Sequence, residues 1–103
     1  MISQIKKDFH EAMIHIYRRA KVEVSYNATR FIQMVSEHGG VEAAKILINT
    51  EKPSDGYTEL WNRGRLDITV EVLVQDQKWE SLFTPQEIER SRQRLVDYGY
   101  KFD

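Results

Sequence analysis

Apolar residues recur every three or four positions through the first quarter of the chain, and this spacing restricts that segment to a helix with one apolar face. We expect the helix to begin after Ser3, a good N-cap residue, and to end near Val24. The stripe consists of Ile2, Ile5, Phe9, Met13, Ile16, Tyr17, Ala20 and Val24. A helix of this kind packs its apolar face against a core.

Glycines divide the next stretch into two helices. Asn27 is predicted to cap the first, and Gly39-Gly40 to end it, because glycine readily adopts the left-handed backbone of a C-cap. The inner side of this helix is predicted to hold Phe31, Met34, Val35 and His38. The segment Val41–Ile48 predicts a third helix, apolar on most sides. A buried αα-hairpin is favoured here over a helix-turn-helix or a phosphate contact, since Val41–Ile48 offers few polar side chains to a groove.

Cap residues mark two later helices. Ser54 or Asp55 is expected to cap a short helix. That helix holds Tyr57, Leu60 and Trp61. The sequence Thr84-Pro85-Gln86-Glu87 has the pattern of a capping box with proline at the first helical position. Gly99 is predicted to end the last helix.

The segment from Arg65 to Val74 is the one ambiguous part of the chain. Its alternation of apolar and polar residues is typical of a strand, but a period of 3.6 also separates a polar from an apolar stripe. No second strand-like run exists to pair with it, and an unpaired strand would leave its backbone groups without partners. We therefore predict a helix. The fold class expected is all-α, a single compact bundle of about five to six helices that forms one domain over residues 1–103.

Composition excludes several classes of function. Fifteen Lys and Arg against sixteen Asp and Glu give a net charge of −1, which argues against a histone-like basic coat. The absence of cysteine excludes disulfides and thiolate chemistry. His10 and His15 are five residues apart, unlike the four-residue spacing of a zinc helix, so no metal and no cofactor is predicted. With neither a signal peptide nor a membrane span expected, the predicted setting is cytoplasmic.

Two groups of side chains are candidates for binding. Arg90 and Arg94 share a face of the last helix, while Arg18, Arg19 and Lys21 lie at the end of the first. If these two helices are neighbours, the five cations form a basic patch that binds phosphate backbones without reading sequence. A solvated face with interleaved acids is the simpler interpretation.

The densest polar and aromatic cluster is formed by Trp61, Arg63, Arg65, Asp67 and Glu71. Carboxylates at i and i+4 repel, so they favour a cation between them or one raised pKa, and Arg65 is the nearest cation in sequence. This cluster is a candidate ligand-holding or acid–base site. The alternatives are an ion pair between helices and a plain surface.

Several stretches resemble a widespread family of small bacterial proteins of uncharacterised activity. The resemblance is carried by residues 26–35, His38-Gly39-Gly40, residues 56–61 and 65–71, residues 82–85, and Tyr98-Gly99-Tyr100. It implies a prokaryotic, cytoplasmic setting, and it transfers no catalytic residue.

These features favour a small non-catalytic interaction module, a bacterial regulator or a defence or mobile-element component, whose partner is a protein or a nucleic acid. Self-association is also expected, because so short a chain buries a limited core. One alternative is a small enzyme or enzyme subunit that uses Arg65, Asp67 and Glu71. Another is a protein inhibitor of a single enzyme.

Overall fold

The computed structural model describes residues 3–102, which form six α-helices and two short 3₁₀ helices, without a strand. Ile2, the first residue of the predicted apolar stripe, lies outside the described residues. The elements are α1 (Gln4–Val24), α2 (Thr29–His38), α3 (Gly40–Ile48), α4 (Asp55–Asn62), η1 (Leu66–Ile68), α5 (Val70–Val74), η2 (Gln77–Leu82) and α6 (Pro85–Asp97). The predicted all-α class is confirmed.

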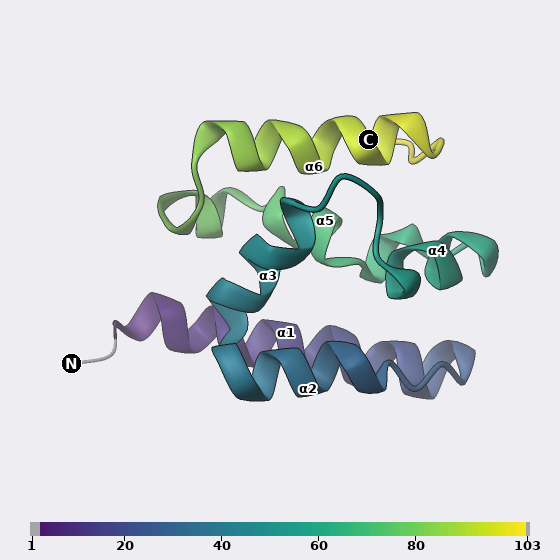
Figure 1. The fold of residues 1–103 in the computed structure, drawn as a ribbon, viewed down its shortest axis with the longest axis horizontal. Helices are drawn as coiled ribbons and strands as arrows, with labels where there is room; N and C mark the ends of the chain where they lie inside the picture. The colour runs from purple at the N-terminus through teal and green to yellow at the C-terminus, as the bar shows by residue number, and fades with distance from the viewer. Residues whose placement is uncertain (1–2, 103) are drawn as a thin grey trace.

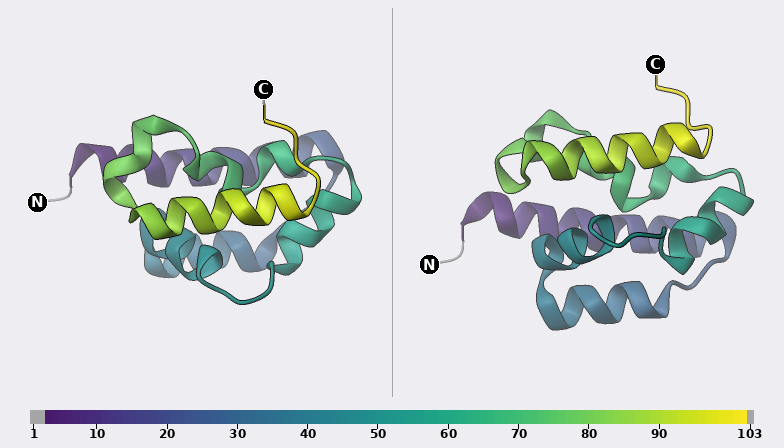
Figure 2. Two further views of the ribbon diagram at one scale, coloured as in Figure 1. Left: turned by 90° about the horizontal axis from the view of Figure 1, so that it is seen from above. Right: turned by 45° about the horizontal axis from the view of Figure 1, so that its top comes forward.

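The helices are stacked in three layers (Figure 1). Helices α1 and α2 lie antiparallel in one outer layer, α6 forms the other, and α3, α4 and α5 lie between them. Figure 2 shows that α1, α2 and α6 all follow the long axis of the molecule. Helix α3 crosses this direction and contacts α1, α2, α5 and α6, so it is the central element of the fold.

Helix α1 follows its predicted bounds. The Ser3 hydroxyl accepts a hydrogen bond from the backbone N–H of Lys6, which confirms the N-cap. At the other end, Ser25 adopts a left-handed backbone with φ of 56°. The buried side chains are Phe9, Met13, Ile16 and Ala20, which are spaced by three and four residues as the stripe predicts.

The core is built around the ring of Phe9, which is fully buried. The Phe9 ring lies edge-on to Trp79 of η2 and to Phe83, with both pairs of ring centroids 5.2 Å apart. Offset and edge-to-face contacts of this kind add to the free energy of burying the rings. Residues 77–83 therefore anchor the C-terminal third of the chain to α1.

The turn between α2 and α3 serves close packing against α1. Gly39 has φ of +85° and ends α2 as predicted, whereas Gly40 begins α3 against the backbone of His10. A Cβ atom at Gly40 would lie 2.6 Å from the His10 Cα, so only glycine permits this approach. The Gly40 N–H donates to His10 Nδ1 at 2.9 Å, and it is therefore not free to contact a phosphate.

Two predictions about α2 are wrong. Ala28, not Asn27, is the N-cap residue, and no side chain caps this end. The Asn27 side chain instead accepts a hydrogen bond from the Tyr17 hydroxyl at 2.7 Å, so it links the turn to α1. His38 is exposed rather than inward, because only one narrow face of α2, centred on Val35, meets the core.

The ambiguous segment 65–74 is helical, but it is divided. Helix η1 ends before Thr69, whose extended backbone interrupts the segment and starts α5. The Thr69 hydroxyl donates to the Leu66 carbonyl and accepts from the Val72 N–H. A threonine that satisfies backbone groups on both sides favours a cap over a helix interior, which explains the break.

Helix α6 begins at the predicted capping box. Thr84 accepts from the Glu87 N–H, while the Glu87 carboxylate accepts from the Thr84 N–H. Gly99, with φ of +83°, lies just after its end and allows the Tyr100 N–H to reach the Leu95 carbonyl.

Candidate ligand-binding cleft

A cleft of about 620 Å³ opens between the C-terminal half of α1, the start of α2 and the segment that connects α3 to α4. Residues of α4 between Asp55 and Leu60, together with residues 68–71 from the end of η1 to the start of α5, complete its lining. Most of the wall is apolar, and its main apolar side chains are Ile16, Ala20, Phe31, Met34, Leu60 and Ile68. A volume of several hundred cubic ångströms and a largely apolar wall are typical of small-molecule sites.

A buried ion pair adjoins the cleft. Glu71 of α5 is part of the lining and only 3% exposed, and its Oε2 accepts from Arg94 Nη1 at 3.1 Å. Arg94 of α6 also donates to the carbonyls of Leu47 at 3.2 Å and Thr50 at 2.6 Å, at the C-terminal end of α3. The Tyr57 hydroxyl of α4 donates to the Arg94 carbonyl at 3.1 Å. Glu71 and Arg94 therefore join four helices.

Burial shapes the ionisation of this group. It raises the pKa of the Glu71 carboxyl, while hydrogen bonds from its own backbone N–H and from Arg94 act in the opposite direction. Burial also raises the pKa of the Tyr57 hydroxyl, and the nearby charge of Glu71 adds to that shift. The Arg94 guanidinium is thus the group that compensates a negative charge at Glu71.

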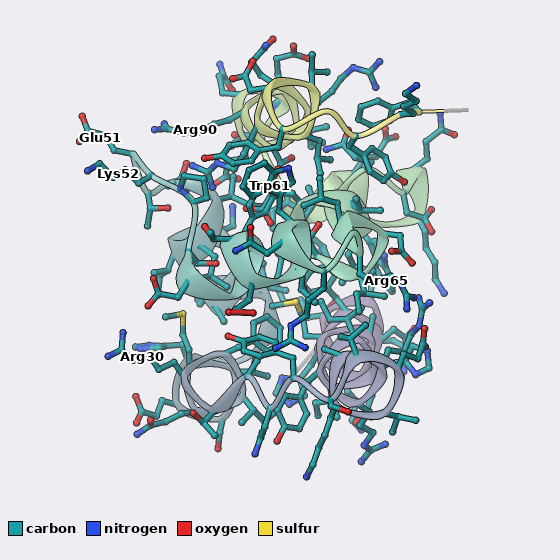
Figure 3. All side chains as sticks on the ribbon, turned by 90° about the vertical axis from the view of Figure 1, so that its right-hand side faces the viewer. Arg30, Glu51, Lys52, Trp61, Arg65 and Arg90 are labelled. Atoms are coloured by element: carbon teal, nitrogen blue, oxygen red, sulfur yellow. The ribbon has the colours of Figure 1, made fainter. Side chains whose placement is uncertain are left out.

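Charged residues stand at the mouth of the cleft. Figure 3 shows Arg30 on α2 and Lys52 on the α3–α4 connection at the same side of the molecule, both pointing outward. Arg30 forms an ion pair with Asp55 at 3.5 Å, but both side chains are almost fully exposed. Such a pair contributes at most about 1 kcal/mol and does not close the cleft.

The predicted basic patch is not assembled. Helices α1 and α6 lie in opposite outer layers with α3 and α5 between them, and Figure 3 shows Arg90 pointing away from the α1 side. Arg94 is buried against Glu71, and Arg19 is paired with Glu23 at 2.8 Å. Of the five predicted cations, Arg18, Lys21 and Arg90 are exposed.

The predicted polar cluster is divided in two. Arg65 pairs with Asp67 at 3.0 Å and with Glu23 of α1, whereas Glu71 pairs with Arg94. The interruption at Thr69 breaks the i, i+4 geometry that would place Asp67 and Glu71 on one helical face.

Trp61 packs against Tyr98, just after the end of α6. Its indole N–H donates to the Tyr98 carbonyl at 3.1 Å, and its ring lies edge-on to that of Tyr98. The Trp61 side chain is 44% exposed, so it combines a fixed orientation with accessible apolar surface.

Glu71 belongs to the predicted polar cluster and Arg94 to the predicted basic patch, so their pairing is not predicted from the sequence. A signal was present, because Arg94 falls between Ser91 and Leu95, which both continue the inward stripe of α6. The polar side chains of the cleft wall, among them Tyr17 and Asn27, gave no such signal, since the turn at residues 25–28 brings them together.

Residues 3–102 lack two kinds of feature. No group of three or more His, Asp or Glu side chains lies close enough to hold a metal ion there. None of the helices in that range is both long and apolar enough to cross a membrane.

No protein family, curated protein or solved structure matches this chain. The resemblance to small bacterial proteins therefore stays a prediction.

Proposed function

We propose that this protein is a non-catalytic binding module that holds an apolar group of its partner in the cleft between α2 and the α3–α4 connection. The observation that carries this proposal is the cleft itself, about 620 Å³ with a mostly apolar wall. A single buried carboxylate, Glu71, adjoins it and is already paired with Arg94. A carboxylate held by Arg94 in a mostly apolar wall suits the recognition of an apolar group.

The nucleic-acid form of the interaction module has less support. The five cations of the predicted basic patch lie on helices in two separate layers, and Arg19 and Arg94 are paired with carboxylates. Nucleic-acid binding without sequence preference requires several unpaired cations along one surface. The small-enzyme alternative requires Arg65, Asp67 and Glu71 to act in one site. It has less support because Arg65 and Asp67 are paired with each other and not with Glu71.

The proposal is tested with a neutral apolar dye and one obstructing substitution. Thr29 is exposed and lines the cleft, so Thr29→Trp should fill the mouth without disturbing the core. We expect Nile red fluorescence to rise with the unmodified protein and the rise to be lost in Thr29→Trp.

The matched control is Gln86→Trp, at an exposed position in the first turn of α6 outside the cleft lining. This variant should bind the dye as the unmodified protein does. Equal binding by all three proteins would place the dye elsewhere and refute the proposed site, as would the absence of any fluorescence rise.

A further inference from the structure

The Glu71 carboxylate retains acceptor capacity beside the cleft. The residue Glu71 is 3% exposed and belongs to the lining of the cavity, and Arg94 is the one side chain within residues 3–102 that donates a hydrogen bond to its carboxylate. An ionised carboxylate offers about four lone-pair positions on its two oxygens. A ligand that places an N–H or O–H group at this wall therefore meets a strong acceptor in surroundings with little water.

The charge balance selects a neutral ligand. Arg94, itself 8% exposed, already compensates the negative charge of Glu71. A cationic ligand would leave a surplus buried positive charge, while an anionic ligand would be repelled by Glu71. Removing an uncompensated charge from water is costly, so both ionic classes are disfavoured at the buried end of the cleft.

The walls favour an aromatic body. Four aromatic side chains line the cleft from three different elements and the turn before α2. They are Tyr17, Tyr26, Phe31 and Tyr57. Rings gain additional stabilisation from edge-to-face and offset contacts with one another, beyond the area they bury.

We propose that the cleft binds a small neutral aromatic molecule whose N–H or O–H group donates a hydrogen bond to the Glu71 carboxylate. This inference rests on the proposed function and specifies the chemistry of its occupant. It predicts a selectivity, for a donor and against charge, that a purely apolar cleft would not show.

The test compares four matched probes by NMR titration of the ¹⁵N-labelled full chain at neutral pH. They are 4-methylphenol (neutral donor), 4-fluorotoluene (neutral, no donor), 4-methylbenzylamine (cation) and 4-methylbenzoate (anion). We expect 4-methylphenol to shift the amide signals of residues 28–34 and 68–71 and to bind about tenfold more tightly than 4-fluorotoluene. The two charged probes should bind more weakly than 4-methylphenol.

Substitutions test whether the preference for a hydrogen-bond donor arises in the cleft. Thr29→Trp should abolish the shifts, and Gln86→Trp should leave them unchanged. Glu71→Gln leaves Arg94 without its counter-charge and can fail to fold, so the double variant Glu71→Leu with Arg94→Met removes both charges together. In that variant the preference for 4-methylphenol over 4-fluorotoluene should disappear.

The outcomes separate this inference from the proposed function. Equal binding of 4-methylphenol and 4-fluorotoluene, or tightest binding of a charged probe, would overturn the donor assignment and leave the apolar cleft in place. Nile red binding without a response to any of the four probes would also overturn the inference alone. Failure of both the dye and the probes would refute the cleft as a binding site.

Discussion

At the scale of single residues, the contact between Gly40 and His10 shows how one position can fix the distance between helices. The Gly39-Gly40 pair is predicted to stop a helix, and Gly39 does so. Gly40 has a different role, because it lets α3 approach the backbone of α1, and its N–H is satisfied by the His10 ring. That role depends on a residue 30 positions away and leaves no trace in the local sequence.

Substitution of Gly40 by alanine should therefore destabilise the protein. The added Cβ would meet the His10 Cα at 2.6 Å, and the two helices would have to separate. We expect Gly40→Ala to lower the free energy of unfolding by about 1–3 kcal/mol, as overpacking does elsewhere, measured by urea denaturation.

Gly56→Ala is the control, because it should not lower the free energy of unfolding. It lies within α4, and a Cβ there meets nothing closer than the Tyr26 hydroxyl at 3.8 Å. Alanine is the better helix former by up to about 1 kcal/mol, so Gly56→Ala should be neutral or stabilising. Similar losses in both variants would show that the close approach at Gly40 has no special energetic weight.

At the scale of elements, α6 shows how far local signals reach. Its cap, first proline and terminal glycine are all encoded within a few residues, and all three were predicted correctly. The segment 65–74 has weaker local signals, and its helix breaks at Thr69, which a periodicity argument does not detect. Tertiary contacts add a second role for α6, since Glu87 also binds Lys45 of α3 at 2.8 Å and Asn49, the residue after α3, at 2.9 Å.

These contacts make the stability contributed by Glu87 dependent on pH. Burial alone would raise its pKa, but hydrogen bonds from Lys45, the Thr84 N–H and Asn49 outweigh it and lower the pKa from 4.5 to about 2. A carboxyl with a depressed pKa stabilises the fold above its unfolded-state value and loses that contribution as pH falls through the folded-state value.

We therefore expect Glu87→Gln to be less stable than the unmodified protein at neutral pH. The difference in unfolding free energy should shrink between pH 4.5 and about 2. Chemical denaturation across this range measures it. Glu89→Gln, an exposed position on the same helix, should follow the unmodified protein at every pH. A Glu87→Gln difference that stays constant with pH would contradict the assigned ion pair.

At the scale of the whole molecule, the Glu71–Arg94 pair ties the middle layer to α6. Arg94 reaches the carbonyl end of α3 and the carboxylate of α5, and its own carbonyl accepts from Tyr57 of α4. The same pair borders the cleft, so the group that holds the layers together also shapes the proposed binding site.

Breaking this pair should be far more costly than breaking a surface pair. Glu71→Gln leaves the Arg94 charge buried and uncompensated, for which we expect a loss of about 3–5 kcal/mol in urea denaturation. Glu59→Gln removes the exposed partner of Arg63 and should cost less than about 1 kcal/mol. A loss at Glu71 as small as that at Glu59 would mean that the buried pair does not join the layers energetically.

The sequence by itself determined the helical class, the long first helix and the caps of α1, α4 and α6, because caps and helical periodicity depend on residues no more than about four positions apart. Only the tertiary structure decided which charges meet and where a cleft remains. Glu71 and Arg94 are 23 residues apart, and Arg65 contacts Glu23 across 42 residues. The stacking of the layers determines which of these distant residues meet. It buries Arg94, which is predicted on the surface, and Arg94 then compensates the charge of the buried Glu71 carboxylate.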